Sequence, residues 1–333
     1  MYSKNQSVVT EFILLGLSED PVMQVVLFPI FLIIYTTTLA GNLLLVVAVR
    51  TDKRLHNSMY LFLATFSILD ILYTSVIVPK MLVNFLSLEK SISYNGCAIQ
   101  VFFYLFWGET ESILLAFMAY DRYVAICHPL RYNTIMSTTV CLWMISFSFL
   151  IGCIISSFDV YFIFSLTYCG PNTINHFFCE SPLVTKLSCS DTSSGNILAL
   201  VGSVIVLLIP LLLILISYVR IIVAIMRIDS GKYKAFSTCG SHFVVVAITY
   251  GTVLFMYMRP QHLDTGDTDK TIAVFYTAIT PMLNPLIYSL RNKDVHRAMR
   301  RLDVMPLIIG TKQISTCPSR ITHRKNVLQR AKC

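Results

Sequence analysis

The chain of 333 residues is strongly apolar, since hydrophobic residues make up 55% of it and charged residues only 13%. Soluble domains carry about 25% charged residues, so this composition excludes an ordinary soluble protein and predicts a protein that crosses a membrane several times. The net charge of +8 does not indicate nucleic-acid binding. The basic residues lie beside apolar runs, where acidic lipid and a cytosolic partner are the available acids.

Seven apolar runs follow one another along the chain, each close to the ~20 residues that a membrane-spanning helix needs. They lie at about 25–49, 58–82, 98–120, 140–163, 197–219, 236–258 and 271–290. We therefore predict an all-α membrane protein with one seven-helix bundle at 25–290, preceded by an extracellular segment at 1–24.

Two further segments follow the last run. Val295, Met299 and Leu302 recur with helical spacing, which predicts a short amphipathic eighth helix at 291–302 on the inner membrane surface. The basic tail at 303–333 is poor in aromatic residues, so we predict that it is disordered and cytosolic.

The distribution of basic residues predicts the orientation of the bundle. One side of the predicted bundle holds 20 of the 26 Lys and Arg residues, and without the distal tail the two sides still hold 14 and 6. The positive-inside rule then places the N-terminus outside. The first 21 residues contain no cleavable signal peptide by pattern, so the first span is expected to act as its own signal. Asn5 begins an Asn-Gln-Ser glycosylation acceptor on the outer side.

The third run ends in Met118–Cys127, which contains an adjacent acid and base, Asp121 and Arg122. Neighbours in sequence do not face each other on a helix, so Arg122 is able to turn toward another helix or a docking protein. The simpler interpretation is a charged pair that marks the end of a spanning helix.

Three other motifs stand at Thr10–Leu17, Lys234–His242 and Pro281–Lys293. Together with Met118–Cys127, and in this order, they resemble the signatures of odorant receptors, which are rhodopsin-like G-protein-coupled receptors. The resemblance covers nearly the whole chain. One departure is Asn57-Ser58, where the family usually has Thr-Pro; either residue still caps a helix, so we expect a local change only.

The resemblance implies a receptor in the plasma membrane that binds a small, largely apolar odorant and activates a heterotrimeric G protein of the olfactory or stimulatory type, raising cyclic AMP. It implies these ligand-binding residues in the outer half of the bundle: Tyr104, Leu105, Gly108, Glu109, Gly202, Ser203, Val206, Tyr250, Val253, Tyr257 and Thr277. It implies these coupling and switch residues: Asp121, Arg122, Tyr123, Tyr218, His242, Asn284, Pro285 and Tyr288. Four outer cysteines allow three pairings, and the family pattern implies Cys97–Cys179 and Cys169–Cys189.

Two acids, Asp70 and Glu111, fall near the middle of the bundle, where like carboxylates must share a proton or a cation. The resemblance implies a sodium site, and sodium is the only metal or cofactor expected. The alternative is a hydrogen-bonded, protonated pair. Glu109 has two interpretations as well, as a group that accepts from a ligand hydroxyl or amine, or as one held by Tyr and Ser neighbours. His242 is either a switch residue or a side chain bonded to a neighbouring carbonyl.

Other functional classes fit the sequence less well. A transporter or channel would show inverted halves or a path of charged midplane residues, and neither is visible. A retinal pigment needs a lysine within the seventh run, and none stands between Thr271 and Leu290. An enzyme is not indicated either, because the sequence shows neither a nucleophile paired with a base nor a phosphate-binding glycine loop. A non-olfactory receptor for small molecules remains the alternative to an odorant receptor.

Overall fold

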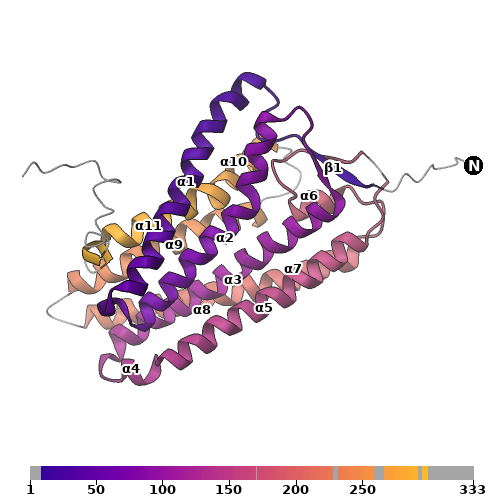
Figure 1. Ribbon diagram of the computed structural model, residues 1–333. Coiled ribbons are helices and arrows are strands. Elements are labelled where there is room, and N and C mark those ends of the chain that lie inside the picture. Colours follow the sequence, from indigo (N-terminus) through magenta and orange to yellow (C-terminus); the bar gives the residue numbers. More distant parts are fainter. Residues whose placement is uncertain (1–8, 170, 228–231, 259–265, 292–294, 299–333) are drawn as a thin grey trace, which may run out of the picture.

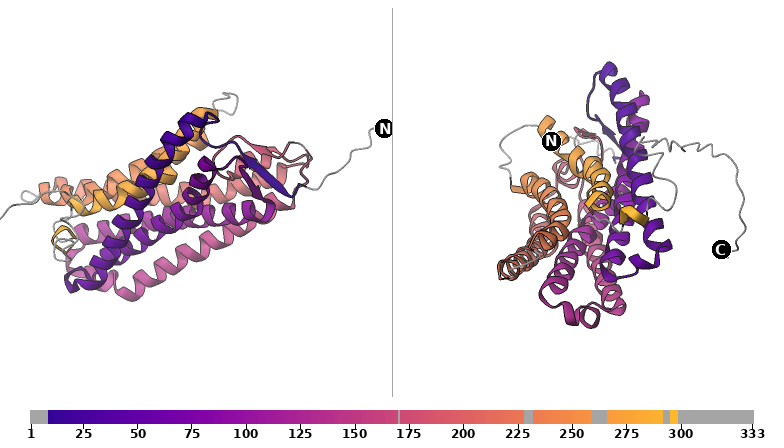
Figure 2. Two further views of the ribbon diagram at one scale, coloured as in Figure 1. Left: turned by 45° about the horizontal axis from the view of Figure 1, so that its top comes forward. Right: turned by 90° about the vertical axis from the view of Figure 1, so that its left-hand side faces the viewer.

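The computed structural model describes residues 9–169, 171–227, 232–258, 266–291 and 295–298. Long helices lie side by side and form an elongated bundle (Figure 1, Figure 2). Strand β1 and the short helix α6 lie at one end of it, and the short helix α4 lies at the other. These are called the sheet end and the α4 end below.

All seven predicted runs are helical, which confirms the predicted fold class. Six helices are long and apolar enough to cross a membrane, and a shorter apolar helical stretch spans Gly240–Phe255 within the described residues. The long elements are α1 (Pro21–Thr51), α2 (Ser58–Leu86), α3 (Tyr94–Cys127), α5 (Thr138–Ser165), α7 with α8 (Ser193–Ser203 and Ile209–Met226), α9 (Lys232–Met258), and α10 with α11 (Gly266–Val274 and Thr280–Arg291). The short helices are α4 (Tyr132–Ile135) and α6 (Ser181–Lys186).

Polar caps set the first residues of α1 and α2, and α1 begins before its apolar run. The Asp20 carboxylate accepts a hydrogen bond from the backbone N–H of Val22 and starts α1 at Pro21. The Asn57 side chain accepts from the backbone N–H of Tyr60, so it caps α2 at the position where the family has Thr.

Two of the long helices contain a π-helical turn, at Val204–Leu208 between α7 and α8 and at Phe275–Ile279 between α10 and α11. Each turn is followed within two residues by a proline, Pro210 or Pro281. A proline has no N–H to donate to the carbonyl four residues earlier, so the regular α-helical bonding is interrupted there. Pro285 lies inside α11.

A three-stranded sheet closes one end of the bundle. Strand β1 (Glu11–Leu14) pairs antiparallel with β2 (Ser91–Ser93) and parallel with β3 (Thr173–Ile174). Phe12 and Leu14 are fully buried while their neighbours in β1 are exposed, which is the alternation of a half-buried strand. The predicted N-terminal segment at 1–24 therefore contributes to the fold, which its composition did not predict.

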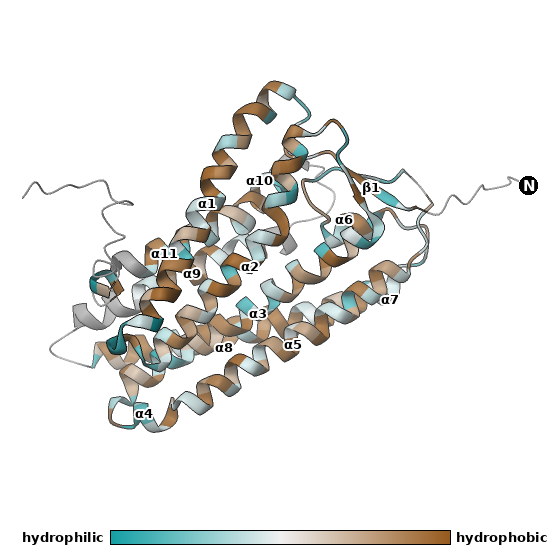
Figure 3. Ribbon diagram, viewed as in Figure 1, coloured by the Kyte–Doolittle hydropathy of each residue, from teal (hydrophilic) through white to brown (hydrophobic). Residues whose placement is uncertain are grey.

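Apolar side chains cover the outside of the bundle, and polar residues gather toward its ends (Figure 3). In the most apolar stretches of α5 and of α7 with α8, only 17% and 22% of the residues are buried. Exposed apolar area of this extent is typical of a surface that faces lipid. At the C-terminal side, 295–298 is helical, and Val295 and Ala298 are buried. Met299, Leu302, the tail at 303–333 and Asn5 lie outside the described residues.

Gly152 sets the distance between α5 and α3. A β-carbon at this position would lie 2.6 Å from the Thr110 Oγ1 atom and 3.1 Å from the Phe106 carbonyl oxygen. Gly251 on α9 has open space, with no atom within 4 Å of such a carbon. The absence of a side chain at Gly152 therefore allows α3 and α5 to pack closely at this point.

We expect Gly152→Ala to lower the free energy of unfolding by about 1–3 kcal/mol, because overpacking forces the α3 backbone away from α5. The matched control is Gly251→Ala, which adds the same methyl group in open space. The unfolding temperatures of both variants, purified in lipid nanodiscs, measure the effect. Equal unfolding temperatures of the two variants would show that α3 and α5 move apart to accommodate the methyl group without a loss of stability.

Candidate functional site: three polar networks in the helix bundle

The first network lies at the α4 end and includes the predicted residues Asp121 and Arg122. The two side chains form an ion pair with 3.6 Å between Nη2 and Oδ2, and both are buried. The Tyr132 hydroxyl donates to Asp121 Oδ1 at 2.7 Å, and the Ser58 hydroxyl donates to the Tyr132 oxygen at 3.0 Å. Burial and the Asp121 charge raise the pKa of Tyr132, so it is a neutral donor. Asp121 is thus held from two sides, and Arg122 is held by Asp121.

Further predicted switch residues surround this pair. The Tyr218 hydroxyl lies 2.7 Å from His242 Nδ1, which joins α8 to α9 inside the bundle. Tyr288 is buried and packs edge-on against Phe66 on α2. The predicted Tyr123 lies apart from them, with its hydroxyl 3.2 Å from His128 Nε2. His242 therefore bonds a side chain on another helix through Nδ1.

The second network lies midway along the bundle. Asn284 on α11 donates from Nδ2 to both carboxylate oxygens of Asp70, at 3.0 and 3.1 Å. Glu111 on α3 is near enough for its charge to act on Asp70. Within the described residues, the buried Oδ1 of Asn284 has no hydrogen-bond partner. Oxygen donors from α2, α3 and α11 therefore converge here, which is the type of ligand that a hard cation prefers.

The same region ties α1 to α11. The Asn42 amide donates to the carbonyl oxygen of Pro281 at 3.1 Å. A β-carbon on Gly41 would lie 3.1 Å from Pro285 Cγ, so this glycine allows the proline of α11 to approach α1. The predicted Pro285 is thus packed against a neighbouring helix.

The third network lies in the half of the bundle nearest the sheet end, where the ligand-binding residues are predicted. Tyr104 on α3 accepts a hydrogen bond from the Ser181 backbone N–H at 2.8 Å and packs edge-on against Phe178. Leu105 packs against the hydrophobic cluster of this half. The Gly108 backbone faces Tyr73 on α2, whose ring would lie 3.5 Å from an added β-carbon.

Two predicted ligand-binding residues face α5. Glu109 on α3 is buried beside Ser156 and Asp159 of α5, and its Oε2 atom has no hydrogen-bond partner among the described residues. Gly202 on α7 faces Ile155, whose Cγ2 would lie 3.1 Å from an added β-carbon.

The remaining members of this predicted set lie on α7 to α11. The Ser203 and Thr277 hydroxyls donate within their own helices, to the Ala199 carbonyl at 2.8 Å and to the Ala273 carbonyl at 2.6 Å. The Tyr250 hydroxyl donates to the Ser112 carbonyl of α3 at 3.1 Å. Val206 is buried and Val253 is half-buried. Tyr257 lies in α9, and its side chain is outside the described part of the chain.

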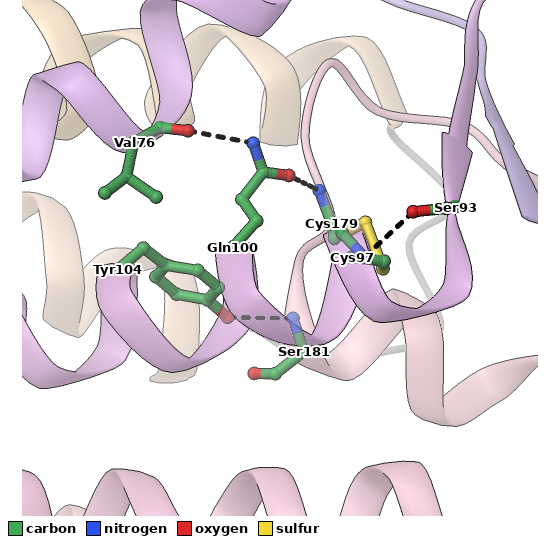
Figure 4. The surroundings of a disulfide bond; sticks show 8 residues. Val76, Ser93, Cys97, Gln100, Tyr104, Cys179 and Ser181 are labelled. Carbon is green, nitrogen blue, oxygen red and sulfur yellow. Dashed lines mark hydrogen bonds between the residues drawn. A yellow bond between two sulfur atoms is a disulfide. The ribbon is translucent and has the colours of Figure 1, made fainter.

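A disulfide fixes the loop that covers the sheet end. Cys97 is bonded to Cys179 and Cys169 to Cys189, with Cα atoms 5.6 and 6.0 Å apart, which are the two pairs that the family pattern implies. Gln100, one turn beyond Cys97, donates to the Val76 carbonyl at 3.0 Å and accepts from the Cys179 N–H at 2.9 Å (Figure 4). The loop is thereby attached to both α2 and α3.

A cluster of buried polar residues lies just beyond this disulfide. Burial, with the nearby Lys270 cation, lowers the pKa of His176 to about 3, so this imidazole is neutral at pH 7. Burial, with the nearby Asp269, raises the pKa of Glu180 to about 7. The 3.8 Å separation between His176 Nε2 and Glu180 Oε2 is therefore a polar contact and not an ion pair.

A small cavity at the sheet end is lined by Gly16, Ser18, Met81, Asn84, Phe85, Lys90 and Phe177. Its volume of about 10 Å³ is close to the least that holds one water molecule. Ligand pockets usually measure about 300–1,000 Å³, and no predicted ligand-binding residue lines this cavity. It is therefore not the predicted ligand site.

Comparison with known proteins decides the family. A family model described as olfactory receptor matches residues 31–305. Olfactory receptor 5AP2 of Mus musculus is 49% identical over 302 residues, which are 90% of this chain and 95% of that protein. The olfactory receptor-like protein OLF1 of Canis lupus familiaris is 51% identical over 299 residues, with 89% and 96% covered. Olfactory receptor 1L4 of Homo sapiens is 50% identical over 305 residues, with 91% and 98% covered.

The chain belongs to the olfactory receptor family. It is a multi-pass membrane protein and not an enzyme.

In this olfactory receptor, the sequence predicted most of the charged site residues but few of the polar residues that contact them. The predicted Asp70 and Asn284, Asp121 and Arg122, and Tyr218 and His242 meet in pairs. Gln100, Tyr132, Asp159 and Glu180 were absent from the predicted site. Only Asp159 carried a visible signal, which is a charge within an apolar run.

Proposed function

We propose that this olfactory receptor binds a small odorant in the half of the bundle nearest the sheet end and activates a heterotrimeric G protein at the α4 end. The G protein is of the olfactory or stimulatory type, so activation raises cyclic AMP. The observation that carries this proposal is the buried ion pair of Arg122 with Asp121, because the two residues are adjacent on α3 and a change of the Arg122 rotamer releases the cation when the neighbouring helices move. A ligand shifts that equilibrium only through its different affinities for the two states.

The orientation of the bundle is part of the proposal. The sheet end, with both disulfides, is extracellular, and the α4 end faces the cytosol of a cell with the receptor in its plasma membrane. Disulfides persist in oxidising compartments, and basic residues gather on the cytosolic side, so both features support this assignment.

A screen tests the function. Cells that produce the receptor are exposed to volatile compounds, and cyclic AMP is measured against cells without the receptor. We expect at least one small, largely apolar compound to raise cyclic AMP only in the receptor cells. Ion uptake by reconstituted vesicles that contain the receptor alone would instead favour a transporter or channel.

Sodium binding at the middle network is a separate part of the proposal. Asp70, Glu111 and the Asn284 Oδ1 atom would hold the ion, whose charge would offset the two carboxylates. We expect Asp70→Asn and Glu111→Gln to remove the dependence of activation on sodium, because each deletes a charge that the ion neutralises.

The measurement compares agonist-induced cyclic AMP in sodium buffer and in buffer with N-methyl-glucamine. The control is Glu19→Gln, which removes an exposed carboxylate outside the bundle. A wild-type response that ignores sodium replacement would favour a protonated carboxyl pair in place of the ion.

A further inference from the structure

A second pair of acids lies between α3 and α5, separate from the middle network. Glu109 is only 7% exposed, and the charge of Asp159 acts on it from α5. Asp159 is half-buried and lies one turn closer to the sheet end than Ser156, so it is the more accessible member of the pair. Isolated charges in such surroundings are costly, so this pair requires an explanation.

Neighbouring protein groups do not neutralise the pair. Within the described residues, neither carboxyl group forms an ion pair with a basic side chain. The Ser156 hydroxyl already donates to the Gly152 carbonyl at 2.7 Å, and Ser156 contacts Glu109 through its backbone. The Glu109 Oε2 atom is buried and has no hydrogen-bond partner in the part of the chain that the structure describes. A buried carboxylate oxygen without a partner is a place where a donor binds.

Apolar residues lie next to the pair along α3 and α5. Ile155 precedes Ser156 and contacts Gly202 of α7, and Phe106 lies about one turn from Glu109 on α3. Helices α3, α5 and α7 lie close together in this half of the bundle (Figure 1). A hard cation prefers a shell of oxygen ligands, whereas beyond the two carboxyl groups the residues named here are apolar. An ammonium group on a hydrocarbon chain fits both features, since its N–H groups meet carboxylates and its carbons meet the apolar residues.

We propose that Glu109 and Asp159 form the recognition site for a small aliphatic amine, bound as its ammonium ion between α3, α5 and α7. This inference rests on the proposed function of a small-molecule receptor and names its ligand class. Glu109 accepts hydrogen bonds from the ammonium group, and Asp159 attracts the cation at the mouth of the site. The alternative is that Glu109 and Asp159 share one proton and have only a structural role.

The test measures binding without signalling. Receptor purified in phosphatidylcholine nanodiscs is titrated with butylamine, hexylamine and octylamine, and in parallel with the alcohols of the same chain lengths, while the unfolding temperature is recorded. Because bound ligand stabilises the folded state by mass action, we expect a saturable rise with at least one amine and a much smaller rise with its alcohol. Failure of the amines here would leave a cyclic AMP response to other odorants intact, so the two proposals fail separately.

Three variants make the test specific. Glu109→Gln is expected to weaken amine affinity by at least about tenfold, since a hydrogen bond to a charged group is lost. Asp159→Asn, at a half-buried position where a fold defect is less of a concern, is expected to weaken it by about fivefold. Glu89→Gln removes an exposed carboxylate on the loop after α2 and is expected to change nothing.

Several outcomes would overturn the assignment. They are the absence of a saturable effect for every amine, equal stabilisation by amine and alcohol, unchanged amine affinity in both Glu109→Gln and Asp159→Asn, and equal stabilisation by sodium chloride at the same concentration. The last outcome would identify an inorganic cation site.

Discussion

Replacing Arg122 with alanine is expected to abolish the cyclic AMP response to an agonist while the receptor still folds. The Arg122 side chain is buried at the α4 end and paired with Asp121, which Tyr132 holds in place. In the proposed active state it leaves Asp121 and contacts the G protein, so its deletion removes that charged contact. Cyclic AMP is measured at matched surface expression.

Arg50→Ala is the matched control for this experiment. Arg50 is exposed near the same end of the bundle, in the last turn of α1, so its loss removes one cation but no buried contact. We expect the control to retain most of the response. A full response from the Arg122 variant at normal surface level would refute the coupling role.

Breaking the disulfide between Cys97 and Cys179 is expected to have the largest effect on stability. The bond joins residues that are 82 positions apart, and a native disulfide of this kind contributes about 2–5 kcal/mol. The loop that it holds buries Phe177 and Phe178 against the bundle, at 1% and 0% exposure. We therefore expect Cys97→Ser to lower the unfolding temperature and to leave most of the protein short of the cell surface.

Cys153→Ser is the control, because Cys153 is an unbonded cysteine on α5 and the same atoms change. Surface labelling and the unfolding temperature of purified receptor measure both variants. Equal behaviour of the two would show that Gln100, which bonds the Cys179 N–H, holds the loop without the disulfide.

Hydropathy was sufficient to locate the seven helices, because a bilayer requires about 20 consecutive apolar residues whatever their neighbours are. It was not sufficient for the sheet. Strand β1 is only four residues long, and its alternation of Phe12 and Leu14 with exposed neighbours is meaningful only once β2 and β3 are known to lie beside it. The π-helical turns were also missed, although Pro210 and Pro281 marked where the bonding changes.

The residues of the candidate site were likewise only partly predictable from the sequence. A charge in an apolar run indicates a buried polar group, so Asp70 and Glu111 were visible in the sequence. The neighbouring helix that each side chain faces depends on how its own helix is rotated about its axis. The sequence of a single helix does not reveal that rotation. Gly108, Glu109 and Gly202 therefore share a predicted role but face α2, α5 and α5 respectively.

The π-helical turn at Val204–Leu208 has a consequence for how this receptor can diversify. One additional residue in a turn rotates everything before it by about 100° relative to everything after it. Gly202 and Tyr218 thus lie on two helical segments whose angular phases are set separately, with Pro210 at the start of the second. Inserting or deleting a residue in that turn would present a new side of α7 to an odorant while Tyr218 still faces His242.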